Sequence, residues 1–194
     1  MSKNKDIFAS DITLARKWYG DKKNISGVPV ILHVQDAAES LKRNYKDLVE
    51  IDSEHFRTLY LAALGHDLFE DTEVEKSEVE KYWGKEVVNL ITLLTNMRGD
   101  KDFTEYIEIL SKSKEDVRLV KLVDIISNLN NSLRTFNQLD KAWVANFWIP
   151  LLDQYNERLL PVPWNKYKHL ASSLTQEIKE KIILLKKRMS SVNA

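Results

Sequence analysis

Apolar residues recur along this chain mostly at spacings of three and four positions, and alternating runs of β-branched residues are scarce. Such spacing is typical of helices that bury one face. The chain has only five glycines and four prolines, so few positions interrupt the pattern. We therefore predict an all-α protein.

The first half of the chain contains five predicted helices, at residues 7–19, 29–45, 53–71, 77–82 and 85–94. Pro29 suits the first turn of the second helix. Asp52 or Ser53 suits the N-cap of the third. Gly20 and Gly27 are the expected turn points of the polar, basic loop between the first two helices. The break at residues 83–84 separates the last two.

The second half contains predicted helices at residues 103–112, 114–136 and about 166–189, with a Pro-Val-Pro turn at 161–163. The last helix carries an apolar stripe among lysines, formed by Ile178, Ile182, Leu185 and Met189. We expect this stripe to pack on the domain or on a second chain, which leaves a homo-oligomer open. Binding to a membrane surface is less favoured, because the stripe is narrow and poor in aromatic residues. There is no internal repeat or linker, so residues 1–194 are predicted to form a single domain.

Composition restricts the partners and the compartment. The 29 basic residues balance the 29 acidic ones, so no global field attracts nucleic acid or an anionic membrane. Cysteine is absent, which excludes disulfides, thiolate metal sites and cysteine nucleophiles. The N-terminus lacks the apolar core of a signal peptide, and no apolar run approaches the roughly 20 residues of a membrane helix. We expect a cytoplasmic protein without nucleic-acid or membrane partners.

The stretch "AALGHDLFEDT", residues 62–72, places His66, Asp67, Glu70 and Asp71 at the end of a predicted helix. Acidic side chains near a helix C-terminus oppose the helix dipole, so capping does not explain them. At a spacing of four residues, His66 faces the same way as Glu70, and Asp67 the same way as Asp71. Imidazole and carboxylate together suit Mn, Fe, Co or Zn better than Ca or Mg. An ordinary polar helix end is the alternative.

Two further segments add candidate ligands. His33 stands among apolar residues in "GVPVILHVQDAA", where a hydrogen-bonded core histidine is the alternative. Asp124 shares the apolar face of its predicted helix, and a buried carboxylate is costly unless it is paired or bound to a metal. A salt bridge to Lys121 or Arg118 is the alternative for Asp124.

The order His33, His66-Asp67, Asp124 resembles the HD superfamily of metal-dependent phosphohydrolases. More narrowly, "HDLFEDT" matches the HDxxEDT signature of the alarmone hydrolase domains of RelA/SpoT-type proteins. The segments "YGDKKNISGVPVILH", "VEKYWGKEVVNLITLLTN" and "VKLVDIISN" are similar to three further motifs of that family, in the same order. The similarity covers about residues 15–132. It implies an HD-domain helical bundle around a metal site, with residues 133–194 as a helical extension packed on it.

The resemblance also implies a role for each matching residue. The implied metal ligands are His33, His66, Asp67 and Asp124, and the implied catalytic pair is Glu70 and Asp71. The implied substrate-binding residues are Lys22 or Lys23 in the basic loop, together with Lys121 and Asn128. The metal expected from the family is Mn²⁺, with Fe, Co and Zn as alternatives. The implied reaction is hydrolysis of a guanosine polyphosphate such as ppGpp, releasing its 3′-pyrophosphate, or of a related nucleotide.

Two departures from the family concern the substrate. Val34 follows the first histidine where alarmone hydrolases usually have proline, and Ile125 follows the last ligand where they usually have arginine or lysine. An HD nucleotidase or phosphatase with another substrate is therefore an alternative, as is a non-catalytic helical binding module. The aromatic residues after residue 132 match no motif, and we interpret them as core or interface: Trp143, Phe147, Trp148, Tyr155 and Trp164.

Overall fold

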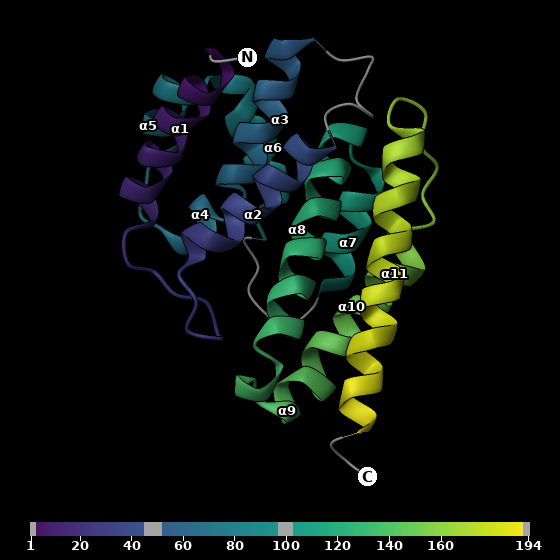
Figure 1. Ribbon diagram of the computed structural model, residues 1–194. Helices are drawn as coiled ribbons and strands as arrows, with labels where there is room; N and C mark the ends of the chain where they lie inside the picture. The colour runs from purple at the N-terminus through teal and green to yellow at the C-terminus, as the bar shows by residue number, and fades with distance from the viewer. Residues whose placement is uncertain (1–2, 45–51, 97–102, 192–194) are drawn as a thin grey trace. The chain divides into compact units, whose positions relative to one another are not determined.

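The computed structural model describes residues 3–44, 52–96 and 103–191, and within these residues every regular element is helical (Figure 1). The one β-type pairing in the described ranges is an isolated bridge between Lys23 and Pro29. The prediction of an all-α protein is confirmed. No helix among the described residues has the length and apolar character needed to cross a membrane.

The chain divides into two compact units, Met1–Met97 and Arg98–Ala194. The expectation of a single domain stays a prediction. The described helices of the first unit are α1 (Lys3–Tyr19), α2 (Val30–Arg43), α3 (Ser53–Gly65), α4 (Leu68–Asp71), α5 (Lys76–Trp83) and α6 (Lys85–Leu94).

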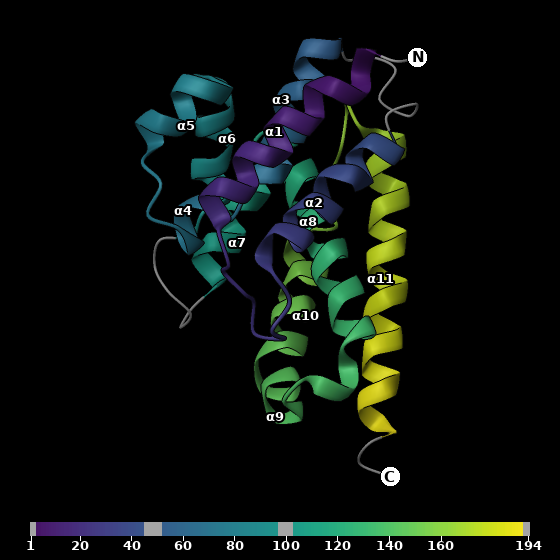
Figure 2. The same cartoon turned by 60° about the vertical axis from the view of Figure 1, so that its left-hand side comes forward.

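Helix α3 is the centre of the first unit. It packs against α2 on one side and α6 on another, and α1 contacts both α2 and α3 (Figure 2). Asp52 is its N-cap and accepts a hydrogen bond from the backbone N–H of His55 at 2.8 Å, as predicted. Every residue from Leu59 to Gly65 is buried. The unit therefore holds the C-terminal end of α3, where the candidate ligands begin, inside its core.

Most predicted helix boundaries in this unit agree with the structure to within one residue. Helix α1 starts before the predicted Ile7, and α2 ends at Arg43, while the expected end at residue 45 lies outside the described residues. Pro29 precedes α2 as its N-cap instead of lying in its first turn. Helices α5 and α6 are separated at Gly84, whose φ of 87° suits glycine.

The predicted continuous helix over residues 53–71 is wrong. Helix α3 ends at Gly65, residues 66–67 form a turn, and α4 starts at Leu68. Asp67 adopts φ −96° and ψ 0°, in the bridge region where the regular helical ladder stops. The backbone N–H groups of both Glu70 and Asp71 then donate to the carbonyl of Asp67. The acidic pair therefore lies in the first turn of a new short helix, where negative charge is favoured.

The second unit contains α7 (Phe103–Lys112), α8 (Glu115–Arg134), α9 (Lys141–Trp143), a π-helical turn (Val144–Trp148), α10 (Ile149–Arg158) and α11 (Lys168–Ser190). A short 3₁₀ turn, Phe136–Gln138, follows α8. Helix α11 lies alongside α8 (Figures 1 and 2), and α10 packs on both α7 and α11. The predicted stripe from Ile178 to Met189 is buried. The stripe therefore packs within the chain's own unit, which was one of the two expected outcomes.

Candidate metal centre

Three of the predicted ligands meet in the first unit. Nε2 of His33 lies 3.1 Å from Nε2 of His66 and 3.6 Å from Oδ2 of Asp67, and Nε2 of His66 lies 3.2 Å from Oδ1 of Asp67. Metal–ligand bonds of about 2.1 Å place neighbouring ligand atoms of one ion roughly 3 Å apart. The three side chains therefore have the separations that a shared divalent ion requires.

The hydrogen bond of His66 fixes which ring nitrogen is available to a metal. Nδ1 of His66 lies 2.8 Å from the carbonyl oxygen of Ala63, one turn earlier in α3. Since a carbonyl can only accept, Nδ1 carries the proton, and in the neutral ring Nε2 keeps its lone pair. That nitrogen is the one that faces His33 and Asp67. Such an anchoring bond is typical of metal-binding histidines.

Burial differs among the three candidate ligands. The His33 and His66 side chains are almost fully buried, whereas the Asp67 side chain is 24% exposed. His33 comes from α2, and the other two from the turn between α3 and α4. The two imidazoles are thus buried, whereas the carboxylate of Asp67 is accessible to solvent.

Glu70 and Asp71 have different surroundings. Oε1 of Glu70 accepts a short hydrogen bond from the backbone N–H of Asn96, just after α6. Burial raises the pKa of the Asp71 carboxyl above its usual range, and the charge of Asp67 raises it further. His66, His33 and Lys22 oppose this rise in the Asp71 pKa. Asp71 is therefore electrostatically coupled to the ligand cluster and to the basic loop.

The basic loop of residues 20–27 is ordered by its own backbone. Gly20 and Gly27 have φ values of 54° and 74°, which confirms the two predicted turn points. The Asn24 side chain accepts hydrogen bonds from two backbone N–H groups farther along the loop, each at 3.0 Å. The loop returns to α2 through a hydrogen bond from the N–H of Val30 to the carbonyl of Lys22 at 2.9 Å.

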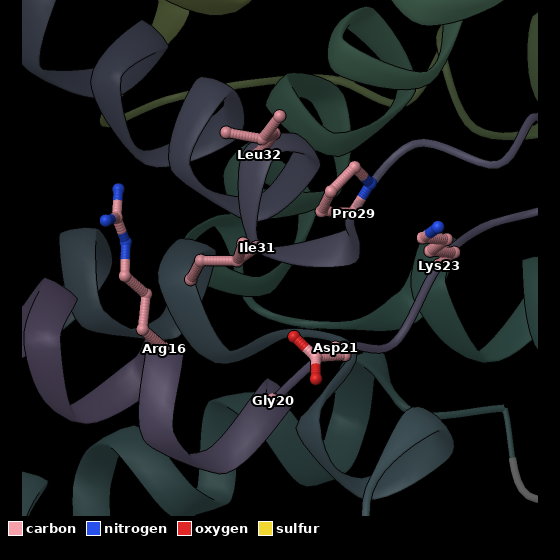
Figure 3. Close-up of a pocket in the computed structure, with 7 residues that line it drawn as sticks. All are labelled: Arg16, Gly20, Asp21, Lys23, Pro29, Ile31 and Leu32. Atoms are coloured by element: carbon pink, nitrogen blue, oxygen red, sulfur yellow. The ribbon is translucent and has the colours of Figure 1, made fainter.

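The two candidate lysines of this loop have different surroundings. Lys22 acts on the pKa of Asp71, whereas Lys23 lines an open pocket of about 620 Å³. Figure 3 shows Arg16 and Lys23 on opposite sides of this pocket, with Ile31 between them. The remaining lining residues are Gly20, Asp21, Pro29 and Leu32. Substrate contact by either lysine stays a prediction.

Asp124 belongs to the second unit, on α8, and is buried there. Its Oδ2 lies 2.7 Å from Nζ of Lys121, and its Oδ1 accepts a 2.7 Å hydrogen bond from Nδ2 of Asn128. The salt bridge to Lys121 that the sequence offered as an alternative is thus present, while Arg118 is 4.0 Å from Glu115. Membership of Asp124 in the ligand set, and contact of Lys121 and Asn128 with substrate, stay predictions.

Tyr19 is a site residue that sequence reasoning missed. Its side chain is fully buried beneath the end of α3, and its hydroxyl donates to the carbonyl of Leu64 at 3.3 Å. Burial, followed by the charges of Asp67 and Asp71, raises the pKa of the phenol well above its usual range, so Tyr19 remains a neutral donor. Its position directly before Gly20 gave no signal of this contact.

Comparisons with known proteins show what the chain is similar to. It is 30% identical over 119 residues to a probable guanosine-3′,5′-bis(diphosphate) 3′-pyrophosphohydrolase of Mycoplasma pneumoniae. The matched segment covers 61% of this chain and 15% of that protein. It is 31% identical over 137 residues to the guanosine-3′,5′-bis(diphosphate) 3′-pyrophosphohydrolase of Aquifex aeolicus, covering 68% of this chain and 18% of that protein. The chain thus spans less than a fifth of these curated relatives. No protein-family model matches it.

A solved structure supports the fold. A metazoan ortholog of SpoT, described as hydrolysing ppGpp and playing a role in starvation responses, matches with a TM-score of 0.65 and 20% identity. The match covers 91% of this chain and 94% of that one. The solved structure shows the fold, and the similarity to the two curated hydrolases confirms the resemblance to SpoT-type hydrolases that the motifs indicated.

Proposed function

We propose that this chain, which has the fold of a SpoT-type hydrolase, is a metal-dependent hydrolase that removes the 3′-pyrophosphate from guanosine 3′,5′-bis(diphosphate). The observation that carries the proposal is the convergence of His33, His66 and Asp67, with the ring of His66 held so that Nε2 faces the other two. The names of the relatives from Mycoplasma and Aquifex support the substrate class. Asp124 is proposed as the fourth ligand, because it occupies the matching place in the order of motifs.

The donor set fits a transition ion. Two neutral imidazoles and carboxylate oxygens suit Mn²⁺, Fe²⁺ or Zn²⁺, and we propose Mn²⁺. When bound, such an ion lowers the pKa of water and polarises a phosphoryl oxygen.

The remaining steps belong to this chain's own side chains. Asp71 accepts the proton of the water that attacks phosphorus, while the P–O bond to the ribose 3′-oxygen breaks and that oxygen takes up a proton to leave as a hydroxyl group. A raised pKa suits this task, because a stronger base takes a proton more readily. Lys22 or Lys23 binds the substrate phosphates. Glu70, the other member of the proposed catalytic pair, shares in this proton transfer, and the hydrogen bond that it accepts from the N–H of Asn96 fixes the short helix that carries both acids.

The proposal extends to partner and location. The partner is a small phosphorylated nucleotide, not nucleic acid or a membrane, since the balanced charge of 29 basic and 29 acidic residues provides no basic field. The proposed compartment is the cytoplasm, because the nucleotide would be found there and because the absence of cysteine agrees with a reducing environment.

The test is release of pyrophosphate from ppGpp by metal-free protein before and after addition of Mn²⁺. His66→Ala and Asp67→Ala should lose both Mn²⁺ binding and turnover. His169→Ala is the matched control, because His169 is exposed on α11 in the other unit and should change neither. Full Mn²⁺ occupancy in both ligand variants, or no Mn²⁺-dependent release by the wild type, would overturn the proposal.

A second candidate is an HD nucleotidase or phosphatase with another substrate. Ile125, in the place of the family's basic residue, favours it. A panel of nucleotides in the same assay decides between the two, since this candidate predicts faster turnover of another phosphate ester than of ppGpp. A non-catalytic module would turn over nothing in the panel.

A further inference from the structure

Both carboxylate oxygens of Asp124 are held by side chains of its own helix. Lys121, one turn earlier, forms a 2.7 Å salt bridge to Oδ2, and Asn128, one turn later, donates to Oδ1 at 2.7 Å. Each carboxylate oxygen has two lone-pair directions, so accepting one such contact on each oxygen does not exclude coordination of a metal. The orientation of Asp124 is therefore set before any ligand arrives.

The ammonium group of Lys121 is enclosed by aromatic rings from two other helices. Nζ lies 5.3 Å from the ring centre of Tyr106 on α7 and 5.6 Å from that of Tyr155 on α10. Both distances are within the range of cation–π attraction. Only 13% of the Lys121 side chain is exposed. The ammonium group of Lys121 is already engaged by Asp124 and by the two rings, so a substrate phosphate would have to compete with these contacts.

We propose that Lys121 is a positioning residue that aligns Asp124 for metal binding, and that it does not bind the substrate phosphates as the family resemblance implied. This inference rests on the proposed function, because it assumes that Asp124 is a metal ligand. Tyr106, Lys121 and Tyr155 lie on α7, α8 and α10 respectively, all within the second unit. Tyr106 and Tyr155 hold the lysine, and the lysine holds the carboxylate.

The two roles predict opposite kinetic effects. Loss of a side chain that orients a metal ligand typically weakens metal affinity or activity by about 10- to 100-fold. Loss of a phosphate-binding lysine raises KM for the substrate and leaves metal affinity unchanged. The dissociation constant for Mn²⁺ and the KM measured at saturating Mn²⁺ therefore separate the two roles.

The experiment compares Lys121→Met with Lys166→Met in the full chain. Methionine is close in length to the lysine stem and removes only the charge and the donor. Lys166 is a matched control, because its Nζ lies 3.7 Å from Asp116 and 4.9 Å from the ring centre of Tyr167 in the same unit. Calorimetric titration of metal-free protein with Mn²⁺ gives the metal affinity without any turnover, and circular dichroism checks the fold.

For Lys121→Met, we expect about 10- to 100-fold weaker Mn²⁺ binding and an unchanged KM for ppGpp at saturating Mn²⁺. Lys166→Met should behave as the wild type. If the Met variant does not fold, Lys121→Gln replaces it, since its amide can still donate one hydrogen bond to Asp124, and a smaller loss of affinity is expected. Unchanged or tighter Mn²⁺ binding together with a raised KM would overturn the positioning role. Failure of the proposed function is a separate result, namely a wild type without Mn²⁺-dependent hydrolysis.

Discussion

The ring of Trp83 packs so closely against Gly65 that a β-carbon on Gly65 would lie 2.7 Å from ring atom Cζ3. The same β-carbon would lie 2.7 Å from Cδ1 of Ile91 and 3.1 Å from Cδ1 of Leu68. Gly65 is the last residue of α3 and directly precedes His66. The absence of a side chain at this one position therefore lets α3 end against α5 and α6 with the candidate ligand at its tip.

Gly65→Ala should destabilise the protein and disturb the metal centre together. Overpacking of this kind typically costs about 1–3 kcal/mol, because the indole ring has little freedom to move away. We expect a lower Tm and weaker Mn²⁺ binding by calorimetry. The double variant Gly65→Ala/Ile91→Val, which removes one of the two closest atoms, should recover part of the Tm. A Gly65→Ala protein with wild-type Tm and metal affinity would contradict this account of the glycine.

Glu70→Gln should keep the fold and the metal and reduce turnover. The glutamine amide oxygen can still accept from the N–H of Asn96, so α4 stays in place. Because Glu70 belongs to the proposed catalytic pair and the amide cannot accept a proton as the carboxylate does, kcat should fall by about 10²-fold or more. Glu70→Ala, which loses the acceptor as well, should in addition lower Tm. Loss of Mn²⁺ from the Gln variant would instead make Glu70 a ligand.

The sequence predicted most of the fold because the signals are local. Apolar spacing placed Phe103–Lys112 at its observed boundaries, and Asp52 had the side chain and position of an N-cap. Gly20, Gly27 and Gly84 marked the points where the backbone needs a positive φ. Each of these signals acts within one helical turn of the residue that carries it.

The break between α3 and α4 could not be predicted in the same way. Leu64 to Phe69 read as a continuous helical pattern, and Gly65 alone is not enough to end a helix. A glycine is needed at position 65 because of contacts with Trp83, 18 residues away, and with Ile91, 26 residues away. These are tertiary contacts, and they leave no periodic pattern in the sequence around Gly65. The enclosure of Lys121 by Tyr106 and Tyr155 is of the same kind, since it joins three helices.

The motif order, in contrast, selected three side chains that meet in the structure. His33 and the pair His66-Asp67 are 33 residues apart in sequence and meet within 3.6 Å. The prediction that His66 faces Glu70 and Asp67 faces Asp71 along one continuous helix was partly wrong, since that helix is interrupted at Asp67. Residue chemistry and motif order selected these candidate ligands, and the helical spacing did not.

The pH dependence of turnover should respond to Lys22. The positive charge of Lys22 lowers the pKa of Asp71, opposing the rise caused by burial and by Asp67. A general base works in its deprotonated form, so activity is lost as pH falls through that pKa. Lys22→Ala removes the opposing charge, raises the pKa of Asp71, and should move the acidic limb of kcat/KM to higher pH. Lys23→Ala is the control and should leave the limb in place. A limb that stays fixed in Lys22→Ala would separate Asp71 from the rate-limiting proton transfer.

Ile125 is the sharpest departure from the alarmone hydrolases, and Ile125→Arg tests what it means. Isoleucine here is 1% exposed, so an arginine without a partner would be a buried charge, costing about 3–5 kcal/mol. An arginine that instead reaches the carboxylates of the acidic pair would favour their ionised form. The first outcome lowers Tm strongly, while the second keeps Tm, moves the acidic limb of the pH–rate profile to lower pH and raises activity on guanosine polyphosphates. We expect the second, because the family places a cation at this position of the motif.

Ile183→Arg is the control. At a site 67% exposed on α11, it should change neither Tm nor rate. A strong fall in Tm confined to Ile125→Arg would show that isoleucine serves the core, and the substrate assignment would then rest on the HDxxEDT match and the similar hydrolases.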